Sequence, residues 1–276
     1  MGRAAPDYSK YSFLNVDKAP NGVVTVTMNR PDTRNALDDD AHEEMRDIWL
    51  DLGNDYEADV IILTGSGKAF CSGGNINNMG DADRPFGGGR PKHPLAVMGA
   101  EARRVARHML DVEQPIIAAV NGDAFGLGAS LALMSDIIIV SETARLADTH
   151  VKVGLVAGDG GAVIWPLLIG PHRAKEFLMR GNRITGAEAA AMGMVNYALP
   201  TDQVMPRAVE IADELAAGSP LAIRWTKYAV NKSIKATYEQ VFDVGIALEM
   251  VSMTTRDHEE GKAAFFERRP PRYTGF

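Results

Sequence analysis

The sequence is poor in cysteine and has no long apolar segment. Cys71 is the single cysteine among 276 residues, so the chain cannot form an internal disulfide, and no neighbouring base marks it as a nucleophile; we interpret it as a small buried thiol. No apolar run approaches the roughly 20 residues of a membrane-spanning helix. The first ten residues also lack the apolar run of a secretion signal. We therefore expect a cytoplasmic protein without a membrane partner.

The chain also lacks a block of positive charge. It has 29 Lys and Arg against 36 Asp and Glu, which gives a net charge of -7. A surface that follows nucleic-acid phosphates needs clustered cations, and Arg268-Arg269 is too short for that, so we expect no nucleic-acid partner. Hydrophobic residues make up 46% of the chain and charged residues 24%, which is typical of a soluble globular protein with a sizeable core.

Glycines punctuate a stretch of 26 residues, 115–140, that otherwise indicates two buried strands around a short helix. Gly126 and Gly128 flank Leu127 at the point where the helix begins. Small side chains let backbone N-H groups approach a ligand there, and a helix start favours negative charge, so this bend is suited to holding an oxyanion. The alternative is a tight turn that needs glycine for geometry alone.

Apolar periodicity predicts the other elements. We expect strands at 23–28, 60–63 and 145–148, and helices at 41–56, 95–110, 163–169, 173–180, 187–192, 209–217, 222–233, 238–250 and 258–266. Prolines and glycines between 81 and 94 predict a mobile loop. Since no strand signal follows residue 206, we divide the chain into a core at 1–200 and a C-terminal helical segment at 201–276.

Five short motifs occur in order along nearly the whole chain. They are Asn29-Arg30-Pro31 with Arg34-Asn35-Ala36-Leu37, Thr64-Gly65 with Ala69-Phe70-Cys71-Ser72-Gly73-Gly74-Asn75, Val120-Asn121-Gly122 with Gly126-Leu127-Gly128, Ser135-Asp136-Ile137, and Phe265-Phe266-Glu267-Arg268-Arg269. This series resembles the crotonase (enoyl-CoA hydratase/isomerase) superfamily. The resemblance implies an α/β fold, a crotonase-like spiral of ββα units with a C-terminal helical trimerisation segment. It also implies a homotrimer or a dimer of trimers, an acyl-CoA substrate, no cofactor beyond the coenzyme A of that substrate, and no metal.

The resemblance also implies site residues. Backbone N-H groups of Gly74 and Leu127 would hold the thioester oxygen, on which charge develops only during reaction. The family usually has glycine at the position of Leu127, and this difference affects the shape of the pocket more than the number of donors. Two catalytic glutamates of family hydratases correspond to Ser130 and His150. Because imidazole titrates near neutral pH and serine does not, we expect His150 to transfer protons, the alternative being a structural histidine.

A narrower similarity concerns the run Gly154-Leu155-Val156-Ala157-Gly158-Asp159-Gly160 with Trp165-Pro166. It is similar to the β-diketone hydrolase branch of the family, which cleaves a carbon-carbon bond with a His/Asp pair and has a histidine where this chain has Leu127. The similarity pairs His150 with Asp159, makes Glu249 a further catalytic residue and places His42 in the substrate pocket, where the broader family resemblance also places Ser130. The alternatives are a turn residue for Asp159, a helix-face carboxylate for Glu249 and an exposed histidine for His42.

Coenzyme A contacts are implied in the same way at Arg34, Phe265 and Arg268, where cations suit phosphates; the alternative for each arginine is a solvated surface charge. We therefore expect an acyl-CoA enzyme that catalyses hydration, isomerisation or a related enolate reaction. One alternative is a hydrolase of a 1,3-diketone or β-ketoacyl-CoA that uses the His150 and Asp159 pair. Another is a non-catalytic acyl-CoA-binding protein, which the missing glutamates suggest.

Overall fold

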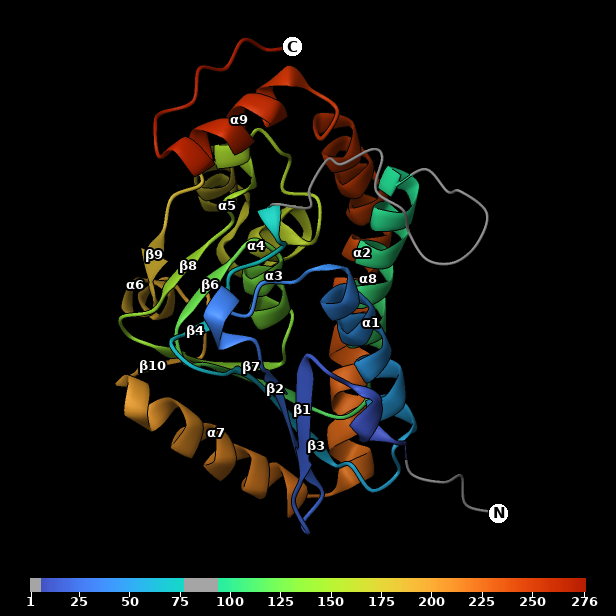
Figure 1. Cartoon of the computed structure of the whole chain (residues 1–276). Helices are drawn as coiled ribbons and strands as arrows, with labels where there is room; N and C mark the ends of the chain where they lie inside the picture. The colour runs from blue at the N-terminus through green and yellow to red at the C-terminus, as the bar shows by residue number, and fades with distance from the viewer. Residues whose placement is uncertain (1–5, 77–93) are drawn as a thin grey trace.

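The computed structural model describes residues 6–76 and 94–276, so the predicted loop at 81–94 lies outside the described residues except for its last position. Two sheets form the centre of the molecule (Figure 1). The larger has the order β1 (Leu14–Lys18), β2 (Val23–Met28), β3 (Val60–Gly65), β5 (Ile116–Val120), β7 (Ile137–Ser141), β10 (Tyr197–Leu199). The smaller has the order β4 (Ala69–Cys71), β6 (Asp123–Phe125), β8 (Arg145–Ala147), β9 (Ile184–Thr185).

A strand of the larger sheet, a strand of the smaller sheet and a helix follow one another three times along the chain. The units are β3-β4-α2, β5-β6-α3 and β7-β8-α4, with α2 at Pro94–Asp111, α3 at Leu127–Leu133 and α4 at Gly161–Ile169. Successive units are parallel neighbours in both sheets, since β3, β5 and β7 pair in the larger sheet while β4, β6 and β8 pair in the smaller. The predicted spiral of ββα units is confirmed.

The larger sheet is buried on both faces. In β3, Ile61 and Leu63 enter the main core, whereas Ile62 packs with Ile211 of α7 (Thr201–Ala216) on the opposite face. Figure 1 shows α7 crossing beneath that sheet. Burial on both faces accounts for a continuous apolar strand instead of an alternating one.

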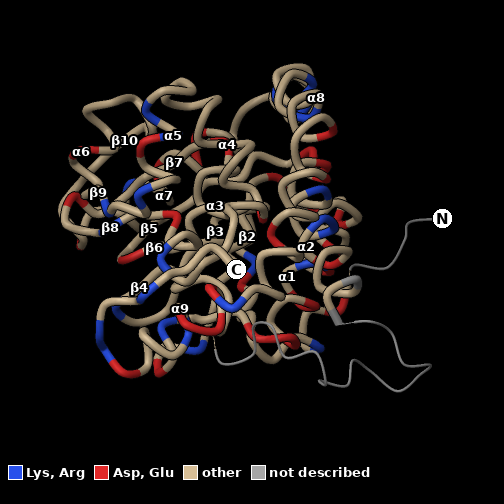
Figure 2. The backbone as a smooth tube through the Cα atoms, turned by 90° about the horizontal axis from the view of Figure 1, so that it is seen from above, with Lys and Arg blue, Asp and Glu red and all other residues tan. Residues whose placement is uncertain are grey.

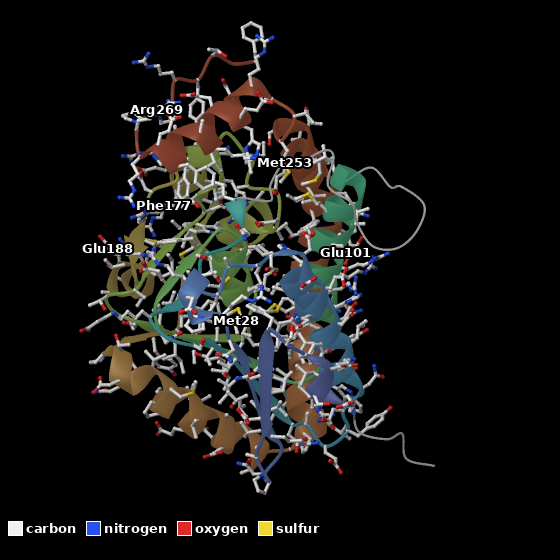
Figure 3. All side chains as sticks on the ribbon, in the orientation of Figure 1. Met28, Glu101, Phe177, Glu188, Met253 and Arg269 are labelled. Atoms are coloured by element: carbon white, nitrogen blue, oxygen red, sulfur yellow. The ribbon has the colours of Figure 1, made fainter. Side chains whose placement is uncertain are left out.

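The remaining helices enclose the core. They are α1 (Asp39–Asn54), α5 (Pro171–Arg180), α6 (Gly186–Ala191), α8 (Pro220–Ser252) and α9 (Arg256–Glu267). The prediction of separate helices at 222–233 and 238–250 is wrong, because α8 is one helix of 33 residues and 234–237 hold no glycine or proline to end it. In Figure 3, Met253 lies where α8 gives way to α9, and its side chain is buried.

Charges of both signs are mixed over the surface. In Figure 2, Lys and Arg alternate with Asp and Glu along α8 and elsewhere on the tube. In the described ranges 6–76 and 94–276, no helix is both long and apolar enough to cross a membrane.

Candidate active site

Two glycine-rich turns from neighbouring ββα units meet at one end of the smaller sheet. Gly73 has a φ of 87°, and a β-carbon there would lie 2.6 Å from the carbonyl oxygen of Phe125, so only glycine allows this approach. The backbone of Leu37 holds the turn by donating to the Gly73 oxygen at 2.9 Å. Within the described residues, neither the Gly74 nor the Leu127 N-H donates to a backbone acceptor. Among the backbone hydrogen bonds of the described turns and loops, these two N-H groups are thus not used as donors.

His150 lies beside the second of these turns. It opens a short 3-10 helix, η4 (His150–Val153), two residues after Asp148 and three after the end of β8. Its Nδ1 is 2.7 Å from Oδ1 of Asp148, a residue that the sequence analysis did not single out. A β-carbon at Gly126 would be 3.8 Å from Nε2 of His150. The imidazole therefore lies against the bend that precedes the Leu127 N-H.

Two more carboxylates face the other ring nitrogen. Nε2 of His150 is 3.3 Å from Oδ2 of Asp159, in the loop before α4, and 3.9 Å from Oε1 of Glu249 on α8. The Gly158 N-H donates to Oε2 of Glu249 at 3.2 Å, and the Ser130 hydroxyl donates to Oδ1 of Asp159 at 3.4 Å. The structure thus brings together the three predicted catalytic side chains and one of the two predicted pocket residues.

The site concentrates charge in a buried volume. Asp148, His150, Asp159 and Glu249 are each no more than 6% exposed. Burial alone would lower the pKa of His150, but the charges of Asp159, Asp148 and Glu249 outweigh it and raise this pKa well above its usual range. Burial raises the pKa of Glu249 to about 8 against the opposing charge of His150. The neighbouring carboxylates therefore favour the charged form of the ring, and burial favours the neutral form of Glu249.

The same groups can be tested as a metal site. Asp148, His150 and Asp159 each offer a ligand atom within 4.8 Å of the others. Asp148 binds Nδ1, however, whereas Asp159 faces Nε2 on the opposite edge of the ring. An ion bonded to one nitrogen would leave one aspartate without a place in its coordination sphere, so the arrangement suits proton transfer better than metal binding.

The other predicted site residues form no hydrogen bond or ion pair with this cluster in the ranges 6–76 and 94–276. His42 is half-buried in the first turn of α1, and its Nδ1 donates to the backbone carbonyl oxygen of Asp38 at 2.9 Å. Arg34 is exposed at the end of the short 3-10 helix η2 (Pro31–Thr33), and Phe265 and Arg268 are exposed at the end of α9. In the part of the chain that the structure describes, no hydrogen bond or ion pair joins these four residues to His150.

Cys71 has the character expected of a structural thiol. It is fully buried at the end of β4, and its Sγ donates to the Asn35 carbonyl oxygen at 3.1 Å. Burial raises the pKa of Cys71 to about 12, so the reactive thiolate form is absent near neutral pH.

A spiral of ββα units that brings two glycine-rich turns beside a buried histidine and three carboxylates defines an enzyme class of the crotonase type. The family described as enoyl-CoA hydratase/isomerase matches residues 18–275, and the chain belongs to this family of acyl-CoA enzymes. The family predicted from the sequence motifs is thereby confirmed.

Individual relatives agree over most of their length. The short-chain-enoyl-CoA hydratase of Clostridium acetobutylicum is 32% identical, with 90% of this chain and 92% of that protein covered. The crystal structure of an enoyl-CoA hydratase/isomerase from Mycobacterium paratuberculosis has a TM-score of 0.85 and 32% identity, covering 93% of this chain and 99% of that one. A β-diketone hydrolase from the cyanobacterium Anabaena sp. PCC 7120, bound to (S)-3-oxocyclohexyl acetic acid, has a TM-score of 0.82 and 32% identity, covering 90% and 96%.

Proposed function

We propose that this enzyme takes an acyl-CoA substrate through an enolate, with His150 as the group that transfers the proton. The Gly74 and Leu127 N-H groups bind the carbonyl oxygen on which negative charge develops, and this interaction is strongest in the transition state. The observation that carries the proposal is the buried imidazole, flanked by carboxylates on both nitrogens, next to the bend that presents the Leu127 N-H.

Each carboxylate then has a separate task. Asp148 keeps a hydrogen on Nδ1, which fixes the ring tautomer and leaves Nε2 as the working nitrogen. Asp159 accepts the Nε2 hydrogen, so that Nε2 can take a proton from the substrate or from water. Glu249, with its raised pKa, serves as the proton store that returns a proton to the enolate.

Hydrolysis of a carbon-carbon bond is the second candidate, and the contact between Asp159 and Nε2 favours it together with the likeness to the Anabaena β-diketone hydrolase. In this reaction His150 removes a proton from water, and the hydroxide adds to one carbonyl of a 1,3-dicarbonyl compound. The bond from that carbon to the central carbon breaks, and its electrons form an enolate held by the two N-H groups. Protonation of the enolate yields a carboxylic acid and a ketone or thioester.

A mass-spectrometric substrate panel distinguishes these reactions. Hydration of a linear enoyl-CoA adds 18 Da, isomerisation leaves the mass unchanged, and cleavage of a linear β-ketoacyl-CoA or 1,3-diketone gives two fragments. A cyclic diketone also gains 18 Da on ring opening, so methylation of the new carboxyl group identifies that case. Binding across the panel without turnover would instead support a non-catalytic acyl-CoA-binding protein.

His150→Ala tests the assignment of the proton-transfer group. General acid/base help typically contributes 10²- to 10⁴-fold, so turnover should fall by about that factor while acyl-CoA binding persists. His172→Ala removes an exposed histidine from α5 and is the matched control. Near-full turnover in His150→Ala contradicts the proposal.

We also propose coenzyme A contacts at Arg34, Phe265 and Arg268, whose exposed side chains can reach a ligand or another subunit. The exposed side chains of Phe265 and Phe266 favour an oligomer, and we propose a homotrimer or a dimer of trimers held by the helical segment 201–276. No cofactor beyond coenzyme A is needed for these steps.

A further inference from the structure

The 3-10 helix that carries His150 is held from outside the core by α9. Figure 1 shows α9 lying across one end of the molecule, above α5 and α4, and Figure 2 views the protein from that side. The contact centres on His258, which is 1% exposed and whose Nδ1 lies 2.8 Å from the carbonyl oxygen of Val153, the last residue of η4. Because a carbonyl oxygen only accepts, Nδ1 of His258 carries the hydrogen.

The C-terminal tail adds a second hydrogen bond to η4. The Tyr273 hydroxyl donates to the Lys152 carbonyl oxygen at 2.7 Å. The tail is in turn fixed to the start of α9, since the carboxylate of Asp257 accepts from the N-H groups of Thr274 at 2.7 Å and Gly275 at 2.9 Å. The last two carbonyl groups of η4 are therefore bound by side chains from the final 19 residues of the chain.

Backbone packing makes this contact tight. Gly154, at a φ of 72°, approaches α9 so closely that a β-carbon there would lie 2.8 Å from the Asp257 carbonyl oxygen. From the other side, a β-carbon at Gly261 would lie 2.7 Å from the carbonyl carbon of Val153. Bulkier residues at either position would push the two elements apart, so glycine at both positions allows α9 to sit directly on the end of η4.

We propose that His258 is a positioning residue for His150, acting through its hydrogen bond to Val153. A 3-10 helix of four residues has too few internal hydrogen bonds to hold its own geometry, and its last carbonyl groups need outside donors. His258 supplies one from a buried position on a longer helix. The aim of the imidazole between Asp148 and Asp159 thus depends on α9. This inference rests on the proposed role of His150.

Two substitutions separate the hydrogen bond from simple packing. His258→Leu removes the donor, whereas His258→Asn places an amide N-H close to the position of Nδ1 and should restore the bond. Ala264→Gly, at a buried position of the same helix, weakens α9 without touching His258 and is the matched control. If His258→Leu does not fold, His258→Gln serves as the variant without the hydrogen bond, because the amide of glutamine lies one bond farther from the backbone than the amide of asparagine.

Histidine labelled with ¹³C at Cε1 gives a readout that needs no substrate. The chain has six histidines, and His150→Gln assigns the His150 signal. The titratable groups that face His150 in the described residues are Asp148 after β8, Asp159 before α4 and Glu249 on α8. Looser contact with them in His258→Leu should lower the midpoint of the His150 titration by about one pH unit. His258→Asn and Ala264→Gly should leave it near the wild-type value.

Kinetics with crotonyl-CoA and acetoacetyl-CoA as probes provide the second readout. A misplaced catalytic group costs rate more than binding, so kcat should fall roughly 10- to 100-fold in His258→Leu with little change in KM. An unchanged titration and kcat in His258→Leu, or equal losses in His258→Leu and Ala264→Gly, overturn the inference. Unchanged turnover in His150→Gln contradicts the proposed function instead. If His150→Gln loses turnover while His258→Leu stays fully active, only the positioning role of His258 is contradicted.

Discussion

Asp148→Asn is the sharpest single perturbation of the site, because it keeps the shape of the side chain and removes one charge. The wild-type carboxylate accepts the Nδ1 hydrogen of His150 at 2.7 Å. An asparagine can turn its NH₂ group toward Nδ1 and donate to it. The ring would then hold its hydrogen on Nε2, the nitrogen that we propose must be free to accept a proton.

Two effects of this change have separate magnitudes. An opposite charge within hydrogen-bond distance shifts a pKa by about 1 to 3 units, so the pKa of His150 should fall by that amount in the variant. The wrong tautomer removes the base itself, which in a comparable His/Asp arrangement costs up to about 10⁴-fold in kcat. We expect a loss of roughly 10²- to 10⁴-fold, the usual contribution of a general base.

The assay is kcat/KM as a function of pH on whichever panel substrate is turned over. In the wild type the activity should rise with pH as the imidazolium loses its proton, because only the neutral ring can act as a base. Asp148→Asn should move this rise to lower pH and depress the plateau. Asp202→Asn makes the same change at an exposed position of α7 and should do neither. A wild-type plateau with an unshifted pH profile in Asp148→Asn would refute the reasoning.

Three further outcomes follow from charge and exposure. The pKa of Glu249 is about 8 in the folded protein and about 4.5 in the unfolded chain, so between these pH values the native state binds one more proton than the unfolded state. The free energy of unfolding should therefore fall as pH rises through this range, by up to about 1.4 kcal/mol per pH unit. Glu249→Gln should flatten that slope in urea titrations at pH 5, 6, 7 and 8, and an unchanged slope would argue against a buried acid. A CoA thioester at 100 times its dissociation constant should add about 2.7 kcal/mol of stability by calorimetry, less in Arg34→Ala and Arg268→Ala; equal stabilisation by the free carboxylate would count against these contacts. Phe265→Ser with Phe266→Ser should lower the mass found by light scattering, whereas a monomeric wild type would exclude the oligomer.

The helical and long-strand parts of the fold could be predicted from the sequence because their patterns are local. The continuous apolar run of β3 and the periodic apolar face of α1 are such patterns. Strands β4 and β6 have three residues each, too few for a periodic signal, and exist because neighbouring units pair with them. The continuity of α8 was missed since two weakly periodic halves were interpreted as separate helices, although nothing between them breaks a helix.

The candidate site was predictable to the extent that motif positions define it. Family similarity predicts His150, Asp159 and Glu249, and the fold brings the two carboxylates within 3.9 Å of Nε2 of His150. Asp148 carried a weaker signal, an acidic residue two positions before the histidine at the end of a short strand. Its closeness to Nδ1 depends on the turn into η4, which no periodicity encodes. The partnership of Gly158 with Glu249 spans 91 positions and is set by tertiary packing alone.

The buried cluster of Asp148, His150, Asp159 and Glu249 also limits how the stability of this protein can be increased. Four ionisable side chains stand where apolar groups of similar volume would pack without loss of hydration, and such replacements of buried ion pairs are often neutral or stabilising by about 1 to 4 kcal/mol. Selection for heat resistance alone would therefore remove these side chains early and leave a more stable protein without the proposed proton-transfer groups. A programme to engineer tolerance to heat or solvent should hold the four positions constant and seek its gains on the outer helices.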